Sequence, residues 1–198
     1  MSRLLDIDGV SKTFTLHTRE GKQLRALSDI NLQLDEGEAI GLTGPSGSGK
    51  STLMKCIHRT YLATEGHILY HANGGEPIDL VRCADQTVLH LRRTQMTYCS
   101  QFLSVIPRID AVEVVATRLL SQGVGFDDAI TRSRQVLDRL NLPEELWDAY
   151  PATFSGGEQQ RINIAQAIIS EPRFLLVDEP TASLDPSTKD VVIDMILE

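Results

Sequence analysis

The sequence G-P-S-G-S-G-K-S-T at residues 44–52 contains the pattern G-x-x-x-x-G-K-[S/T] of a phosphate-binding loop. It follows the apolar run of residues 39–42, which predicts a strand, and it precedes a helix-like segment at residues 53–58. The glycines let backbone N–H groups point toward phosphate oxygens, and the helix adds the positive end of its dipole. A Gly/Ser-rich turn that matches by chance is disfavoured by this strand–loop–helix context. The segment therefore predicts a site for a nucleoside triphosphate.

Two side chains of this loop have predicted tasks of their own. Lys50 is long enough to reach the β- and γ-phosphates, and the Ser51 hydroxyl can ligate Mg²⁺. The residues predicted to bind the nucleotide here are Gly44, Ser46, Gly47, Ser48, Gly49, Lys50, Ser51 and Thr52.

Size and composition favour one cytoplasmic α/β domain. The chain has 198 residues, 41% of them hydrophobic, and a net charge of −8, which argues against a nucleic-acid partner. No apolar run approaches the ~18 residues that a membrane span needs. The N-terminus carries acids where a signal peptide needs an apolar stretch. The three scattered cysteines, Cys56, Cys83 and Cys99, indicate reduced thiols rather than a metal site.

Hydrophobic periodicity predicts an antiparallel start followed by alternating helices and strands. Residues 3–10 and 24–34 alternate as strands do, with Gly21 in the turn between them. The remaining predicted strands are residues 66–71, 78–81, 96–100 and 174–177, with a turn at 73–75, and the predicted helices are residues 85–95, 111–120, 127–140, 156–170 and 188–197.

A second nucleotide motif, F-L-L-V-D-E, occupies residues 174–179. A continuous apolar run is typical of a strand buried on both faces, and acids at its carboxyl end lie where ligands bind in open α/β sheets. Asp178 is predicted to bind Mg²⁺, and Glu179 to polarise the water that attacks the γ-phosphate. Two solvated acids at a strand end are the alternative, which the phosphate loop makes less favourable.

The segment F-S-G-G-E-Q-Q-R at residues 154–161 predicts a helix start. Ser155 can cap the helix, and Glu158, three residues later, completes a capping box. Two glycines leave the first N–H groups exposed, and such a helix end binds an anion well. An ordinary capped helix is the alternative that this segment alone leaves open.

The order of these motifs resembles the ATP-binding-cassette (ABC) ATPases along the whole chain. The series is the phosphate loop, Gln101 after a strand, the Ser-Gly-Gly segment, Asp178-Glu179, and Ser183-Leu184-Asp185. The resemblance implies an α/β fold, with a mostly parallel sheet flanked by helices. It also implies an antiparallel N-terminal β subdomain and a helical subdomain at about residues 102–165 of a single domain spanning residues 1–198. ATP and Mg²⁺ are the implied cofactors.

The resemblance also assigns roles to individual residues. Gln101 would sense the γ-phosphate and the Mg²⁺ that Ser51 and Asp178 also ligate. Phe14 resembles the aromatic residue that stacks on adenine, although a core phenylalanine explains it nearly as well. The segment Ser155, Gly156, Gly157, Glu158 and Gln159 would close on the ATP of a partner cassette, and Asp185 would reach across that dimer.

Four segments resemble one family more closely than the general pattern: residues 61–66, 100–109, 140–147 and 153–161. They are similar to the L component of the bacterial carbon–phosphorus lyase system, which degrades phosphonates. That resemblance implies an accessory ATPase in the step where a phosphonate displaces adenine from ATP to give ribose 1-phosphonate 5-triphosphate. The implied partners are a second cassette of the K type and the core lyase subunits.

Two other functions stay open. The first is the ATPase subunit of a membrane transporter of the lipoprotein-releasing or macrolide-exporting type, where residues 102–108 would contact a separate permease. The second is a non-hydrolysing clamp that only assembles a complex, which the presence of Glu179 disfavours.

ABC ATPases carry a further histidine, in a loop after one more strand beyond the catalytic glutamate. The last histidine here is His90, and the sequence stops at Glu198 within a predicted helix. We therefore expect the 198-residue chain to be C-terminally truncated, to bind MgATP and to hydrolyse it slowly.

Overall fold

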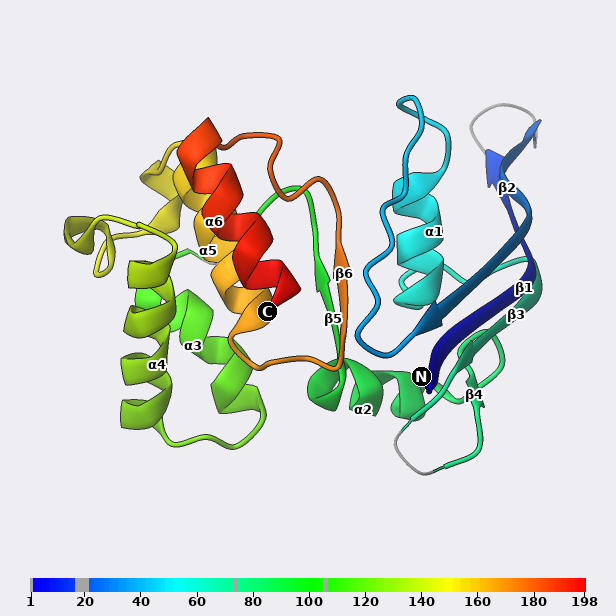
Figure 1. The fold of residues 1–198 in the computed structure, drawn as a ribbon, viewed down its shortest axis with the longest axis horizontal. Helices are drawn as coiled ribbons and strands as arrows, with labels where there is room; N and C mark the ends of the chain where they lie inside the picture. Colours follow the sequence, from blue (N-terminus) through cyan, green and yellow to red (C-terminus); the bar gives the residue numbers. More distant parts are fainter. Residues whose placement is uncertain (1, 17–21, 73–74, 105–106) are drawn as a thin grey trace. The chain divides into compact units, whose positions relative to one another are not determined.

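The computed structural model describes residues 2–16, 22–72, 75–104 and 107–198 (Figure 1). The chain divides into two compact units, Met1–His90 and Leu91–Glu198, called unit 1 and unit 2 below, and the boundary falls inside helix α2 (Asp85–Thr94). Gly21 and residues 73–74, where turns are predicted, lie outside the described residues.

Unit 1 is built on an antiparallel sheet with the strand order β2-β1-β3-β4. The strands are β1 (Arg3–Leu16), β2 (Lys22–Asp35), β3 (Glu65–Tyr70) and β4 (Ile78–Asp79), which confirms the predicted antiparallel N-terminal part. Gly66 on β3 has φ +86°, and a Cβ there would lie 2.6 Å from backbone atoms of Asp8 and Gly9. The strands β3 and β1 can therefore approach each other only because residue 66 has no side chain.

Helix α1 (Lys50–Ile57) follows the phosphate loop and contacts β2. It buries Leu53, Met54, Cys56 and Ile57 in unit 1. The residue before it, Gly49, has φ +99°, and a Cβ there would lie 2.6 Å from the Ala26 carbonyl oxygen of β2. The end of the loop thus rests directly on the sheet backbone.

The predicted strand before the phosphate loop is absent. Residues 39–42 have no strand conformation, and the Ile40 side chain is 40% exposed. A strand requires a neighbour that pairs with its N–H and C=O groups. Within unit 1, none of the strands formed by the described residues pairs with this run, so its apolar character alone does not produce a strand.

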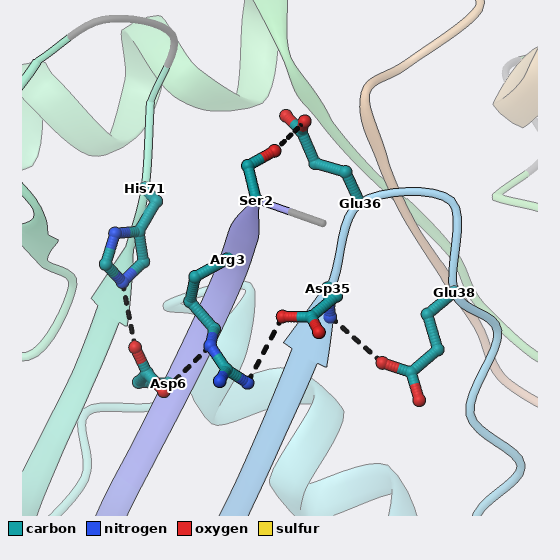
Figure 2. A network of polar contacts seen from close by, with 7 residues as sticks. All are labelled: Ser2, Arg3, Asp6, Asp35, Glu36, Glu38 and His71. Atoms are coloured by element: carbon teal, nitrogen blue, oxygen red, sulfur yellow. Dashed lines mark hydrogen bonds and ion pairs between the residues drawn. The ribbon is translucent and has the colours of Figure 1, made fainter.

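A network of charged side chains connects β1, β2 and β3 at one end of the strands, where the chain leaves β2 toward the phosphate loop (Figure 2). Arg3 on β1 contacts Asp6 at 3.5 Å and Asp35 on β2 at 3.3 Å, and His71 after β3 contacts Asp6 at 2.9 Å. The Asp35 N–H donates to the Glu38 carboxylate at 3.0 Å. The network therefore links the end of β2, after which residues 36–43 follow, to β1 and to the residue after β3.

Unit 2 combines a parallel strand pair with helices (Figure 1). Strands β5 (Met96–Cys99) and β6 (Phe174–Val177) pair in parallel, with Cys99 opposite Val177. Among the described residues, the parallel part of the predicted sheet consists of this pair. The helices are α3 (Ala111–Ser121), α4 (Phe126–Arg139), α5 (Gly156–Ile168) and α6 (Pro186–Leu197), with short 3₁₀ turns at Glu144–Leu146 and Pro151–Thr153.

Helices α3, α4 and α5 pack together around one apolar core in unit 2. Leu137 and Leu140, predicted to share a face of their helix, are both fully buried. Helix α6 begins at Pro186, two residues before the predicted start, because Asp185 caps it and proline suits the first helical position.

Each unit contains a buried free cysteine, Cys56 in unit 1 and Cys99 in unit 2. Burial raises the pKa of the Cys56 thiol, and burial together with nearby Asp178 raises the pKa of Cys99 to about 12. In the part of the chain that the structure describes, no helix is long and apolar enough to cross a membrane.

Candidate nucleotide and catalytic site

The phosphate loop is formed by backbone conformations that favour glycine. Gly44, Gly47 and Gly49 have φ values of +149°, +79° and +99°. These left-handed or extended positive values cost little for glycine and more for any other residue. Residues 44–48 are exposed, and the first turn of α1 has no side-chain cap. The loop and the start of the helix thus present a backbone surface suited to an anion.

Lys50 currently folds over its own loop. Its ammonium group donates to the carbonyl oxygens of Gly44 at 2.8 Å and Pro45 at 3.0 Å. Phosphate oxygens are stronger acceptors for an ammonium group than neutral carbonyls are. A triphosphate bound at this loop would therefore compete with the two carbonyl oxygens for the Lys50 ammonium group.

Phe14 lies in a small cluster of rings and cations. Its ring meets Tyr61 edge to face at 5.2 Å, and the Lys12 ammonium lies 4.8 Å from its centroid. The side chain is partly exposed, so it is not the core phenylalanine of the alternative interpretation. Adenine stacking by Phe14 stays a prediction. No role beside Phe14 was predicted for Tyr61 or Lys12, although their aromatic and cationic character was the available signal.

In unit 2, the carboxyl ends of β5 and β6 bring three predicted residues to one edge. The parallel register places Gln101 and Asp178-Glu179 just after paired residues. The Gln101 side-chain amide donates to the Glu179 carboxylate at 3.0 Å, and the Tyr98 hydroxyl donates to the Asp178 carboxylate at 3.0 Å. Asp178 is only 5% exposed, whereas Glu179 is exposed.

Glu179 has φ +52°, a left-handed conformation that is uncommon outside glycine. Such backbone strain persists only where the surroundings support it, and it is frequent at functional sites. Tyr98 belongs to this group although the motifs do not predict it. Its signal was a hydroxyl-bearing aromatic residue on the strand that leads to Gln101.

The predicted capping box at the start of α5 is confirmed. The Ser155 hydroxyl accepts from the Glu158 N–H at 3.3 Å, and the Ser155 N–H donates to the Glu158 carboxylate at 2.7 Å. Hydrogen bonds to the Glu158 carboxylate from the Ser155 side chain and from its backbone N–H lower the pKa of Glu158. At Gly157, a Cβ would lie 3.0 Å from the Ser183 carbonyl oxygen. The glycine thus lets this helix start lie against the loop before α6.

Two residues predicted to act across a dimer have contacts within their own chain. Gln159 donates to the carbonyls of Pro151 at 3.0 Å and Phe154 at 3.2 Å. Asp185 accepts from the Thr188 N–H at 3.1 Å and from its hydroxyl at 2.6 Å, as the cap of α6. Their roles in a partner site stay predictions.

The residues predicted to bind Mg²⁺ have suitable chemistry. Ser51 offers a hydroxyl oxygen in unit 1, and Gln101 and Asp178 offer an amide and a carboxylate oxygen in unit 2. No group of three or more His, Cys, Asp or Glu residues in the described part of the chain could hold a metal ion.

A family model described as ABC transporter matches residues 27–182, which include the phosphate loop, Gln101, the Ser155 segment and Asp178-Glu179. The chain belongs to the ABC transporter ATPase family. The lipoprotein-releasing system ATP-binding protein LolD of Maricaulis maris is 35% identical over 189 residues, 96% of this chain and 79% of that protein. The LolD protein of Geobacter metallireducens is 37% identical over 193 residues, 97% of this chain and 81% of that protein.

A longer relative and a solved structure complete the comparison. The probable export ATP-binding/permease protein MacB of Pseudomonas entomophila is 37% identical over 98% of this ABC chain, which spans 28% of MacB. The ATP-binding cassette MJ0796, in a dimeric post-hydrolysis state bound to ADP and Pi, superposes with a TM-score of 0.87 at 28% identity, over 98% of this chain and 81% of its own. The predicted ABC fold is confirmed, and the chain is an ABC-type ATPase.

Proposed function

We propose that this ATPase binds MgATP at the phosphate loop and hydrolyses it with Glu179 and Gln101, as one half of a dimer that shares two nucleotide sites. The Gln101–Glu179 hydrogen bond carries the catalytic part of the proposal. It joins a potential general base and a polar sensor at the edge where Asp178 also lies. The dimeric structure of MJ0796, with 28% identity, supports the paired arrangement.

Each side chain has a separate task in this mechanism. Lys50 leaves its loop carbonyls and binds the phosphates, and the N–H groups around Gly47 orient them. Mg²⁺, when bound through Ser51, Gln101 and Asp178, would neutralise charge on the phosphate oxygens. The exposed Glu179 carboxylate accepts a proton from the attacking water, and the Gln101 amide orients that carboxylate.

The partner assembly has two candidates. The relatives named for lipoprotein release and for export support a membrane permease as the partner, with this chain on the cytoplasmic side. The transporter function therefore replaces phosphonate processing as the first candidate. Phe102, directly after Gln101, is 73% exposed and would be a suitable apolar contact for a permease.

Phosphonate processing remains the second candidate because α5, which begins in one of the segments that resemble the carbon–phosphorus lyase L component, contacts two of the others. Arg161 donates to the Asn141 carbonyl in the segment at residues 140–147, and Asn163 donates to the Ser100 carbonyl in the segment at residues 100–109. Two of the four segments are thus held by the same helix, which supports a shared contact surface for a partner. The partners in this reading are a K-type cassette and the soluble lyase core.

Affinity co-purification of the full-length tagged protein tests both candidates. It is performed from cells that grow on a phosphonate as the sole phosphorus source, in parallel with detergent-solubilised membranes. Recovery of an integral permease in the detergent fraction supports the transporter. Recovery of soluble lyase subunits with a second cassette contradicts the transporter and supports the phosphonate role. Replacement of Phe102 by Ser should weaken the permease contact, while replacement of exposed Phe126 on α4 serves as a matched control.

A further inference from the structure

Besides Gln159, three side-chain amides of helix α5 donate hydrogen bonds to backbone carbonyls in three other segments. Gln160 donates to the Pro180 carbonyl at 3.3 Å, Asn163 to the Ser100 carbonyl, and Gln166 to the Val114 carbonyl of α3 at 3.0 Å. Buried amides are costly unless they are hydrogen-bonded. The carbonyls of Pro180 and Ser100 therefore satisfy the two amides that are buried, Gln160 and Asn163.

Two of these amides reach the loops that carry the candidate catalytic residues. Ser100 directly precedes Gln101, and Pro180 directly follows Glu179. Gln160 and Asn163 are three residues apart, which places them on neighbouring positions of one helix face. Both are buried, with exposed fractions of 4% and 6%.

We propose that Gln160 and Asn163 are positioning residues that fix the loops of Glu179 and Gln101 to the helix that begins at Ser155. The proposal rests on the catalytic assignment of Gln101 and Glu179 in the proposed function. Because the capping box and both amides belong to one helix, a shift of its start on contact with a partner's nucleotide carries the two loops with it. Binding of the partner's nucleotide at residues 155–157 thereby sets the positions of Gln101 and Glu179 for ATP hydrolysis in the same chain.

The test compares Asn163→Ala with Gln166→Ala in the full-length protein. Gln166 is the matched control, since it donates to Val114 and Thr117 on α3 and contacts neither catalytic loop. A misplaced catalytic group lowers turnover steeply, so Asn163→Ala should lower kcat about ten- to a hundredfold with little change in KM. Amide hydrogen exchange should rise at residues 100–104 in this variant. Gln166→Ala should preserve both kcat and that protection.

A second variant protects the test against misfolding. Asn163→Leu keeps approximately the side-chain size and removes the NH₂ donor without burying a charge beside the Ser100 carbonyl, so it should lose turnover like Asn163→Ala while folding. Because Asn163 acts through Gln101, Asn163→Ala should cause little further loss of kcat in a Gln101→Ala background.

The outcomes separate this inference from the function on which it depends. If Gln101→Ala lowers kcat but neither Asn163 variant does, the positioning role is wrong and the catalytic assignment stands. Equal losses in the Asn163 and Gln166 variants also overturn the positioning role, because they indicate general destabilisation of α5. If Gln101→Ala leaves kcat unchanged, both the catalytic assignment and the inference fail.

Discussion

The phosphate loop of unit 1 and the catalytic edge of unit 2 reach their geometry by different means. The loop depends on backbone conformation, since three of its glycines have positive φ. Its one long side chain, Lys50, donates hydrogen bonds to carbonyl oxygens of the same loop. The edge after β5 and β6 depends on side chains, since Tyr98, Gln101 and Asn163 each form a hydrogen bond across segments. Steric changes should therefore damage the first region, and loss of single polar atoms should damage the second.

The largest expected effect comes from Glu179→Gln in unit 2. The substitution keeps the size and an acceptor for Gln101 but removes the base, so kcat should fall about 10²- to 10⁴-fold. ATP affinity should stay near that of the natural protein, and ATP should still promote dimers. Steady-state ATPase assays and size-exclusion chromatography with ATP measure these effects. A variant with normal turnover would show that Glu179 is not the base.

In the phosphate loop, Gly49→Ala and Gly47→Ala form a matched pair. Both residues have positive φ, but a Cβ at Gly49 would lie 2.6 Å from the Ala26 carbonyl oxygen, whereas a Cβ at Gly47 meets nothing within 4 Å. Gly49→Ala should reduce the free energy of unfolding by about 3 kcal/mol, and Gly47→Ala by about 1 kcal/mol. Urea denaturation measures both. Equal losses would mean that steric fit against β2 does not support the loop.

Lys50→Ala tests the one side chain on which the loop depends. Loss of charge-assisted hydrogen bonds to phosphate should weaken ATP binding about ten- to a hundredfold. Isothermal titration calorimetry measures the affinity, and the free energy of unfolding should change little because Lys50 bonds to its own exposed loop. Unchanged affinity would contradict the assignment of residues 44–52 as a phosphate site.

Tyr98→Phe removes a single oxygen atom at the catalytic edge. The hydroxyl donates to Asp178, a nearly buried carboxylate, so its loss should reduce the free energy of unfolding by about 1–2 kcal/mol. Chemical denaturation measures this loss, and Tyr150→Phe, at an exposed tyrosine of the same unit, is the control. Equal stability of the two variants would show that the Tyr98 hydroxyl does not stabilise the Asp178 carboxylate.

The smallest effect concerns pH and the capping box. Hydrogen bonds from Ser155 lower the pKa of Glu158 in the folded chain below the ordinary value of about 4.3. The resulting stabilisation is present above about pH 4.3 and is lost as pH falls through the lowered pKa. Glu158→Gln should remove this part of the pH dependence and cost less than about 1 kcal/mol near neutral pH. The free energy of unfolding of both proteins is measured from about pH 3 to 6, a range that brackets the ordinary glutamate pKa of about 4.3. Parallel curves for the natural protein and Glu158→Gln would contradict this contribution of Glu158.

Local patterns predicted those parts of the fold that depend on near neighbours. The capping box at Ser155, the helix that includes Leu137, and the parallel strand at residues 174–177 follow from short-range spacing and are confirmed. The prediction of a strand at residues 39–42 is wrong, because strand pairing depends on a partner segment that an apolar run does not specify. Within the candidate site, the sequence predicted Gln101 and Glu179 but not Tyr98 or Asn163. Their contacts join residues 80 and 63 positions apart, which no local pattern encodes.

The placement of the buried cysteines gives each unit its own natural reporter. Cys56 in α1 and Cys99 at the end of β5 are shielded from solvent, and their raised pKa values keep them as unreactive thiols. An alkylating reagent can modify either thiol only when its surroundings open. Labelling rates at the two positions, separated by peptide mass, would therefore report the opening of units 1 and 2 independently in the unmodified sequence. Nucleotide added to such an experiment would reveal which unit it protects without an engineered probe.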